Sequence, residues 1–250
     1  RVLEATIIGI VGLLLSIHYG GGVAADPIWG PRFTFEGIQL AWMLIGYGFI
    51  ASVLPVWLLL APRDYLSTFL KLGTVFMLAA AVLFVLPELQ MPALTKFVDG
   101  SGPVFPGTLF PFLFITIACG AVSGWHSLVS SGTTPKLLAN EADARMIGYG
   151  GMLLECFVAV TALVAACALQ PGVYFALNSP AAAIGGDVQS AAAAISQWGF
   201  VVTPEMLQHT ADGIGEATIL SRTGGAPTLA VGMANILSQL FSGPGMMAFW

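Results

Sequence analysis

Long stretches of this chain contain almost no charged side chain, and this feature restricts the fold more than any other. Residues 38–60 read IQLAWMLIGYGFIASVLPVWLLL, and about 20 such apolar residues in a helix cross a hydrocarbon core about 30 Å thick. In the whole chain 8% of the residues are charged and 57% are hydrophobic, whereas a soluble domain carries roughly 25% charged residues. The polar groups are too few to cover a water-exposed surface. The sequence therefore predicts an all-α integral membrane protein, folded as a multi-span helical bundle.

Six segments are predicted to span the membrane, one of them only in part, and the whole chain, residues 1–250, is interpreted as a single fragment of a longer transmembrane domain. A less apolar link over residues 171–226 is predicted to lie outside the membrane. It should carry short helices, because Asp187 and Thr203 are side chains suited to capping a helix start. The predicted spans are residues 2–18, 38–60, 65–86, 109–129, 146–169 and 229–250.

The few charged residues indicate an orientation and exclude some partners. Basic residues are enriched on the cytoplasmic side of membrane proteins, which favours a cytoplasmic N-terminus here. The net charge is −5 with eight Lys and Arg, so the clustered basic residues that nucleic acids require are missing. Three scattered cysteines lack C-x-x-C spacing, and no metal or cofactor is predicted. In this orientation Arg1, Arg63, Lys71, Lys136 and Arg145 lie inside, and Arg32, Lys96 and Arg222 lie outside.

The span predicted over residues 109–129 runs into a polar stretch at residues 120–134. Inside a bilayer an irregular backbone is tolerated only where it is buried in protein or lines a watery cavity. Glycines and hydroxyl side chains allow the helix to unwind, and the freed groups can bind a polar solute, as in secondary transporters. The alternative is a face of small residues for close helix packing. The candidate solute-binding residues are Gly120, Ser123, Gly124, His126, Ser130, Ser131, Gly132, Thr133 and Thr134.

Two ionisable residues are candidates for proton coupling. Glu155 lies near the middle of the predicted span 146–169, where an acidic group costs roughly 2.5–3.5 kcal/mol and should face the bundle interior or a water-filled cavity. Gly148 and Gly151 share its helical face and leave room for a neighbouring backbone. His126 can exchange a proton near neutral pH. The alternatives are that His126 is a packing residue and that Glu155 only hydrogen-bonds an adjacent helix.

Two further residues predict local features of the helices. Pro55 removes one hydrogen bond from the helix expected over residues 38–60, which predicts a kink that can act as a hinge. Asp64 is predicted to cap the following helix, residues 65–86, at the inner face of the membrane.

Six segments of the sequence resemble the carbon starvation protein A (CstA) family, and together they extend over nearly the whole chain. Where the family pattern has Phe-His followed by Ala, this chain has Trp125 and His126 followed by Ser127. The segments are PVWLLLAPRDYLSTFLK (55–71), MPALTKFVDG (91–100), LFPFLFITIACGAVSG (109–124), SSGTTPK (130–136), IGYGGMLLE (147–155) and GGAPTLAVGMA (224–234).

This resemblance implies a secondary transporter of the bacterial inner membrane that serves the response to carbon starvation. It implies import of a pyruvate-like acid or of short peptides by proton-coupled symport, and no enzyme activity. It also implies a likeness to the amino acid–polyamine–organocation superfamily, whose core is an inverted repeat with broken helices. The expected partners are the small solute, protons, the lipid bilayer and the rest of the same polypeptide, because the family's chain is far longer.

Two other functions remain open. Ser123 and His126 lie three residues apart and suggest an intramembrane serine hydrolase, although no third group to orient the histidine is apparent. A membrane sensor or scaffold that transports nothing is the second alternative. Such a protein would not require a carboxylate in the middle of the membrane or an unwound helix.

Overall fold

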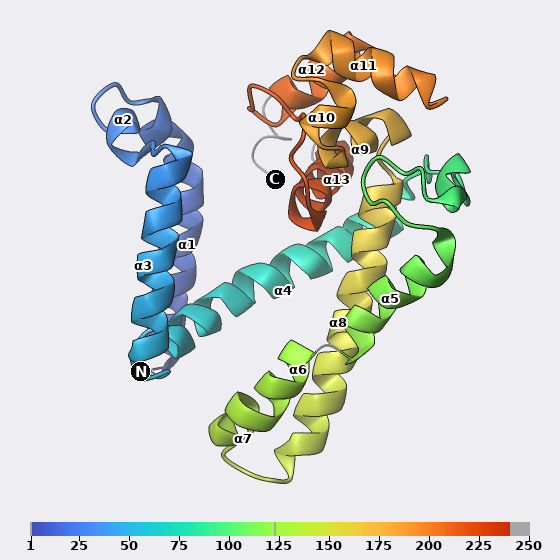
Figure 1. Ribbon diagram of the computed structural model, residues 1–250. Coiled ribbons are helices and arrows are strands. Elements are labelled where there is room, and N and C mark those ends of the chain that lie inside the picture. Colours follow the sequence, from blue (N-terminus) through green and yellow to red (C-terminus); the bar gives the residue numbers. More distant parts are fainter. Residues whose placement is uncertain (1, 123, 241–250) are drawn as a thin grey trace. The chain divides into compact units, whose positions relative to one another are not determined.

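The computed structural model describes residues 2–122 and 124–240, and this part of the chain consists of helices and their connections, with no strand (Figure 1). Three helices are long and apolar enough to cross a membrane, over Leu3–Ala25, Leu60–Val85 and Asp143–Cys167. The prediction of an all-α membrane protein is confirmed. The chain divides into two compact units, Arg1–Met77 and Leu78–Trp250.

The first unit contains α1 (Val2–Ala25), α2 (Gly30–Phe33), α3 (Gly37–Val53) and the first part of α4 (Leu60–Val85). The helices α1 and α3 carry apolar side chains on every side, and most of these side chains are exposed. Gly30 is the one buried residue among those described in this unit. Helices of this kind are suited to contact with lipid or with other membrane helices.

Polar contacts in the first unit fix a turn and link two helices. The Asp26 carboxylate accepts hydrogen bonds from the N–H groups of Ile28 and Trp29 at 2.8 and 3.0 Å. These two donors, Trp29 first, lower the pKa of Asp26. The Thr6 and Tyr65 hydroxyls, which lie on α1 and α4, are 2.9 Å apart.

Two local predictions in this unit are wrong. α3 ends at Val53 and α4 begins at Leu60, so Pro55 terminates a helix instead of kinking one. The reason is that proline disfavours a helical conformation at the residue before it, and Leu54 is indeed extended, with ψ 149°. Asp64 lies inside α4 and not at its cap, because α4 begins four residues earlier, with Pro62 in its first turn where a missing N–H is tolerated.

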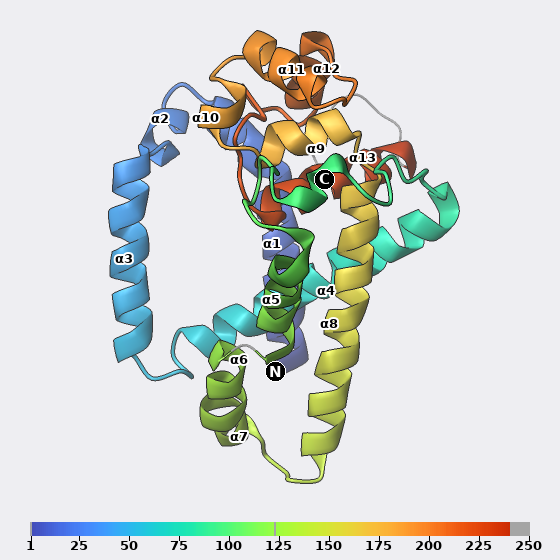
Figure 2. The same cartoon turned by 45° about the vertical axis from the view of Figure 1, so that its right-hand side comes forward.

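The second unit holds the rest of the chain. Figures 1 and 2 show α6 and α7 near the N-terminal end of α8, with α9–α12 gathered beyond its C-terminal end. Residues 241–250 of the predicted sixth span lie outside the described residues. The elements after α4 are η1 (Lys96–Asp99), α5 (Leu109–Val122), α6 (Gly124–Leu128), η2 (Val129–Thr133), α7 (Thr134–Leu137), α8 (Asp143–Cys167), α9 (Pro171–Asn178), α10 (Ala181–Ile184), α11 (Val188–Gln197), α12 (Pro204–Gly213) and α13 (Gly225–Leu240).

A hydrophobic core lies among α9–α12 and the adjoining loops. Leu177, Ile195 and Leu207 are each at most 1% exposed. Aromatic rings extend the core, with the rings of Phe175 and Phe200 stacked at 4.6 Å between centroids. The long loop before α5 also contributes, since the ring of Phe97 packs against this cluster.

Capping residues start two of these short helices where the sequence predicts them. The Asp187 carboxylate accepts hydrogen bonds from the N–H groups of Gln189 and Ser190 at 3.0 and 2.9 Å. The Thr203 hydroxyl accepts one from the N–H of Met206 at 3.3 Å. The predicted starts of α11 and α12 are therefore confirmed.

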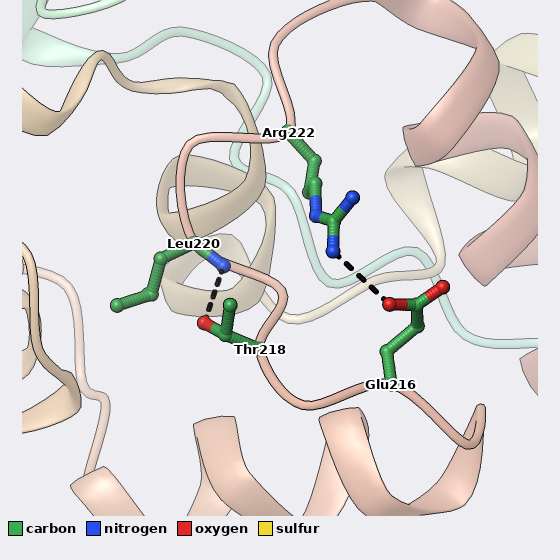
Figure 3. Close-up of polar contacts among 4 residues, drawn as sticks. All are labelled: Glu216, Thr218, Leu220 and Arg222. Atoms are coloured by element: carbon green, nitrogen blue, oxygen red, sulfur yellow. Dashed lines mark hydrogen bonds and ion pairs between the residues drawn. The ribbon is translucent and has the colours of Figure 1, made fainter. Parts of the chain in front are cut away.

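The connection from α12 to α13 is held by its own polar contacts (Figure 3). Arg222 Nη2 lies 3.0 Å from Glu216 Oε2, and the Leu220 N–H donates to the Thr218 hydroxyl at 3.1 Å. The Ser221 N–H reaches back to the carbonyl of Ala176 in α9, at 3.0 Å. The half-exposed ion pair contributes about 0–1 kcal/mol. The loop is tied to the core by the backbone bond to α9 and by the side chain of Ile219, which is 2% exposed and belongs to the hydrophobic cluster.

Candidate functional site

The polar stretch at residues 120–134 is helical but irregular. α5 ends at Val122, α6 covers Gly124–Leu128, and the candidate Ser123 between them lies outside the described residues. The next turn, η2, is π-helical: the Thr134 N–H donates to the carbonyl of Val129, five residues back. Such turns interrupt regular helices and occur frequently at functional sites. In the described part of this stretch a π-helical turn interrupts the regular α-helix, where the sequence predicts unwound backbone.

Hydroxyl side chains explain why the backbone stays helical here. Ser130 Oγ and Ser131 Oγ both donate to the carbonyl of Ser127, at 3.1 and 2.7 Å. Thr134 Oγ1 donates to the carbonyl of Val129 at 3.2 Å. These bonds give partners to carbonyls in a turn where the regular ladder is disturbed. Each hydroxyl oxygen keeps lone pairs that can accept a hydrogen bond from a solute.

The other candidate binding residues lie along the same stretch. His126 is exposed on α6, and Thr133 is exposed at the end of η2. At Gly120 and Gly132, no described atom beyond the adjoining residues and the backbone of the same helix lies within 4 Å of the position that a side-chain Cβ would occupy. Gly124 is the first residue of α6. The described part of this stretch is thus accessible along its length.

Glu155 is the central residue of α8, a helix of 25 residues. At 1.5 Å per residue this helix is about 37 Å long, so its middle would lie near the centre of a core about 30 Å thick. The Glu155 side chain is exposed, and no hydrogen bond or ion pair links it to another residue of the described chain. Gly148 and Gly151 have open space beside them. No hydrogen bond or ion pair joins Glu155 to residues 120–134 in the part of the chain that the structure describes.

A buried polar pair that the sequence did not predict joins α9 to α13. Asn178 Nδ2 donates to Thr228 Oγ1 at 2.7 Å and to the carbonyl of Tyr174 at 3.0 Å. Asn178 is 7% exposed and Thr228 is 4% exposed. Both line a cavity of about 560 Å³ next to the first turn of α13. The one signal in the sequence is a carboxamide at the end of the apolar run VYFALN.

Burial and close packing shape the surroundings of this pair. Burial raises the pKa of Tyr174, which lines the same cavity, and the nearby Cys167 raises it further. α13 approaches α8 so closely that a Cβ at Gly232 would lie 2.5 Å from the carbonyl oxygen of Ala165. A glycine is therefore required at this contact.

Comparison with known sequences places the chain next to membrane transporters. The family model described as carbon starvation protein CstA matches residues 1–250. The chain is 63% identical over 240 residues to the peptide transporter CstA of Escherichia coli K12, which covers 94% of this chain and 34% of that protein. It is 61% identical over 251 residues to the peptide transporter CstA of Campylobacter jejuni, which covers 100% and 36%.

A second named activity occurs among the relatives. The chain is 53% identical over 272 residues to the pyruvate/proton symporter BtsT of Escherichia coli K12, which covers 100% of this chain and 38% of that protein. The chain thus spans about a third of the length of the curated relatives it matches. No solved structure matches it significantly.

Proposed function

From the premise that this chain belongs to the carbon starvation protein CstA family, we propose that it forms part of a secondary transporter for a pyruvate-like acid or short peptides, driven by proton entry. The support comes from relatives named as peptide transporters and as a pyruvate/proton symporter. These names describe transport and not hydrolysis, which favours solute flux over an intramembrane serine hydrolase.

The observation that carries the proposal is the π-helical turn at η2 with its row of hydroxyls. A regular apolar helix has no polar atom to offer a solute in the membrane, whereas this turn presents the exposed side chains of Ser130, Ser131 and Thr133. The solute binds at these hydroxyls and at the glycines on either side, where its polar groups gain partners that lipid cannot supply. The proposed binding residues are Gly120, Ser123, Gly124, His126, Ser130, Ser131, Gly132, Thr133 and Thr134.

Glu155 takes up the proton in this proposal, with His126 as a second carrier. A charged carboxylate in the middle of a span is unfavourable by roughly 2.5–3.5 kcal/mol. Protonation of Glu155 therefore lowers the free energy needed for the protein to change from facing outward to facing inward. Proton release to the higher pH on the inner side then gives the transport cycle its direction. Gly148 and Gly151 keep the surface of α8 beside Glu155 open to a neighbouring segment.

The proposed location is the inner membrane of a bacterium, with the N-terminus of this chain in the cytoplasm. The support is the distribution of basic residues over the connections. The loop between α7 and α8 is preceded by Lys136 and followed by Arg145, and basic residues next to short loops favour the cytoplasmic side.

The test is Glu155→Gln in the full-length protein, reconstituted in proteoliposomes with an imposed inward pH gradient. Glutamine is similar in size but carries no titratable proton, so uphill accumulation of solute should fall at least tenfold, while solute exchange without a gradient continues. Glu141→Gln, in the exposed turn before α8, is the matched control and should accumulate solute like the wild type. Accumulation at the wild-type level by Glu155→Gln would remove this residue from the mechanism. A wild-type protein without any flux would favour a sensor or scaffold.

A further inference from the structure

Two cavities adjoin where α8 ends, away from the polar stretch 120–134. Their volumes are about 440 and 300 Å³, and Gln170 and Asn235 line both of them. Ligand sites for small molecules have volumes of roughly 300–1,000 Å³. We call the two cavities together the amide groove, after the four carboxamide side chains that line it: Gln90, Gln170, Asn235 and Gln239.

The groove is built from side chains that share helical faces. On α13, Val231, Asn235 and Gln239 are spaced four residues apart and lie on one face. On α12, Glu205 and His209 have the same spacing and both line the larger cavity. The remaining wall comes from the segment that follows α4 and from the residues between α8 and α9. The fold thus collects polar side chains from four separate parts of the sequence.

The carboxamides of the groove are largely free to bind a ligand. The side chains of Gln90, Gln170 and Asn235 form no hydrogen bond with another residue in the described ranges, whereas Gln239 Nε2 donates to the carbonyl of Asn235 at 3.2 Å. Asn235 is half-buried within the apolar run 229–250, where an unpaired amide is unfavourable. Each free carboxamide offers one acceptor and two donors, which match the N–H and C=O of a peptide group.

The charges of the groove select against an anion. Each cavity contains one glutamate, Glu88 in the smaller and Glu205 in the larger, and neither cavity is lined by a lysine or an arginine of the described chain. Hydrogen bonds from its own backbone N–H and from the Thr203 hydroxyl lower the pKa of Glu205. The groove is therefore negative at neutral pH and favours a ligand with a positive group.

We infer that the amide groove binds a short peptide, whose backbone pairs with the carboxamides and whose terminal ammonium lies beside Glu88 or Glu205. The inference rests on the proposed transport function and adds a second site to it. A pyruvate-like acid carries a carboxylate and no ammonium, so the groove discriminates against it. The groove thus selects between the two solute classes.

The experiment measures binding of trialanine and N-acetyl-trialanine to the full-length protein in nanodiscs by isothermal titration calorimetry. The wild type should bind trialanine at least tenfold more tightly than the acetylated peptide, which has lost its ammonium. Gln170→Leu and Asn235→Leu should each weaken trialanine binding at least tenfold. Gln197→Leu is the matched control, because Gln197 is exposed on α11 and lines neither cavity; its affinity should stay within twofold.

Several results would overturn the inference. These are no trialanine binding by the wild type, equal affinity for the two peptides, or unchanged affinity in Gln170→Leu. Because Gln170 is exposed, a loss of affinity in this variant is not explained by misfolding. The melting temperatures of all variants are also measured. A lower melting temperature of Asn235→Leu alone would show that Asn235 packs against another segment of the polypeptide. Proton-driven uptake of pyruvate and of trialanine by the same variants, reconstituted in proteoliposomes, separates the two proposals. Uptake with unchanged peptide affinity in the variants refutes the groove alone, and peptide binding without any uptake refutes the transport function alone.

Discussion

The helices α9–α12 and the helices α1 and α3 both contain many apolar side chains, but they place them in opposite environments. In the first group Leu177, Ile195 and Leu207 are at most 1% exposed, whereas Leu14 on α1 is 57% exposed and Ile45 on α3 is 61% exposed. The helices of the first group are short: α9 has eight residues, and α11 and α12 have ten each. α1 has 24 residues.

The difference shows that helix length and the arrangement of polar residues decide where apolar side chains go. Short capped helices such as α11 and α12 turn back on one another, and their apolar faces meet in a core of their own. A long helix that is apolar on every side has no single face to bury. It must be surrounded by lipid or by further helices. Three sets of variants test this difference between the two groups of helices.

The largest effect is expected from shortening a side chain in the core of the α9–α12 region. Leu207→Ala should reduce the free energy of opening this region by about 2–5 kcal/mol, because it leaves a cavity among packed side chains. Ile45→Ala removes a similar volume from an exposed position on α3 and should have a much smaller effect. Hydrogen exchange of the α12 and α3 amides in the reconstituted protein measures both. Equal effects would show that α3 is also packed, against segments beyond this chain.

A smaller effect with a change of sign is expected for adding a methyl group to two glycines. Gly232→Ala should destabilise the contact of α13 with α8 by about 1–3 kcal/mol, because the new Cβ meets the carbonyl of Ala165. Gly150→Ala, on the open surface of α8, should stabilise its helix by up to about 1 kcal/mol. Thermal unfolding of the two variants measures the difference. If both variants were stabilised, the close approach of α13 to α8 would be refuted.

The smallest effect concerns the acid sensitivity of the start of α11. The Ser190 N–H, the Ser190 hydroxyl and the Gln189 N–H lower the pKa of Asp187 below its ordinary value of 3.8. The folded state therefore binds the proton less readily than the unfolded state, and the cap stabilises α11 fully above that value. This contribution is lost as the pH falls through the lowered pKa.

Hydrogen exchange of α11 at a series of acidic pH values measures this loss. Asp187→Asn keeps a capping side chain that does not titrate, so its protection should not show the added decline that the wild type shows at the acidic end. An identical decline in both proteins would assign the acid sensitivity to another group.

Several features of the fold could be predicted because they depend on neighbouring residues alone. The caps at Asp187 and Thr203 act within three residues of the chain, and both are confirmed. The family resemblance is also confirmed, since its segments are continuous in sequence. Pro55 shows the limit of such local reasoning. It was expected to kink a helix, and it ends one because nothing at residues 54–59 outweighs its effect on the backbone.

The candidate site was predictable in part. The composition of residues 120–134 predicted an interruption, but its π-helical form depends on which carbonyls Ser130, Ser131 and Thr134 select. The pairing of Asn178 with Thr228 joins residues fifty positions apart. No local sequence pattern predicts such a pair, because the pair forms only when α9 and α13 pack together.

The sequence alone indicated a helical membrane protein, because a chain with so few charges and such long apolar runs cannot cover a water-exposed surface. Its continuous motifs indicated the CstA family. The tertiary structure decided which apolar residues form a core and which polar ones meet. Gln90, Gln170 and Asn235 are far apart along the chain, and only the packing of α8, α9 and α13 brings them to one groove. Burial and hydrogen bonding between distant segments depend on the whole fold, whereas helix formation and capping depend on neighbours in the chain.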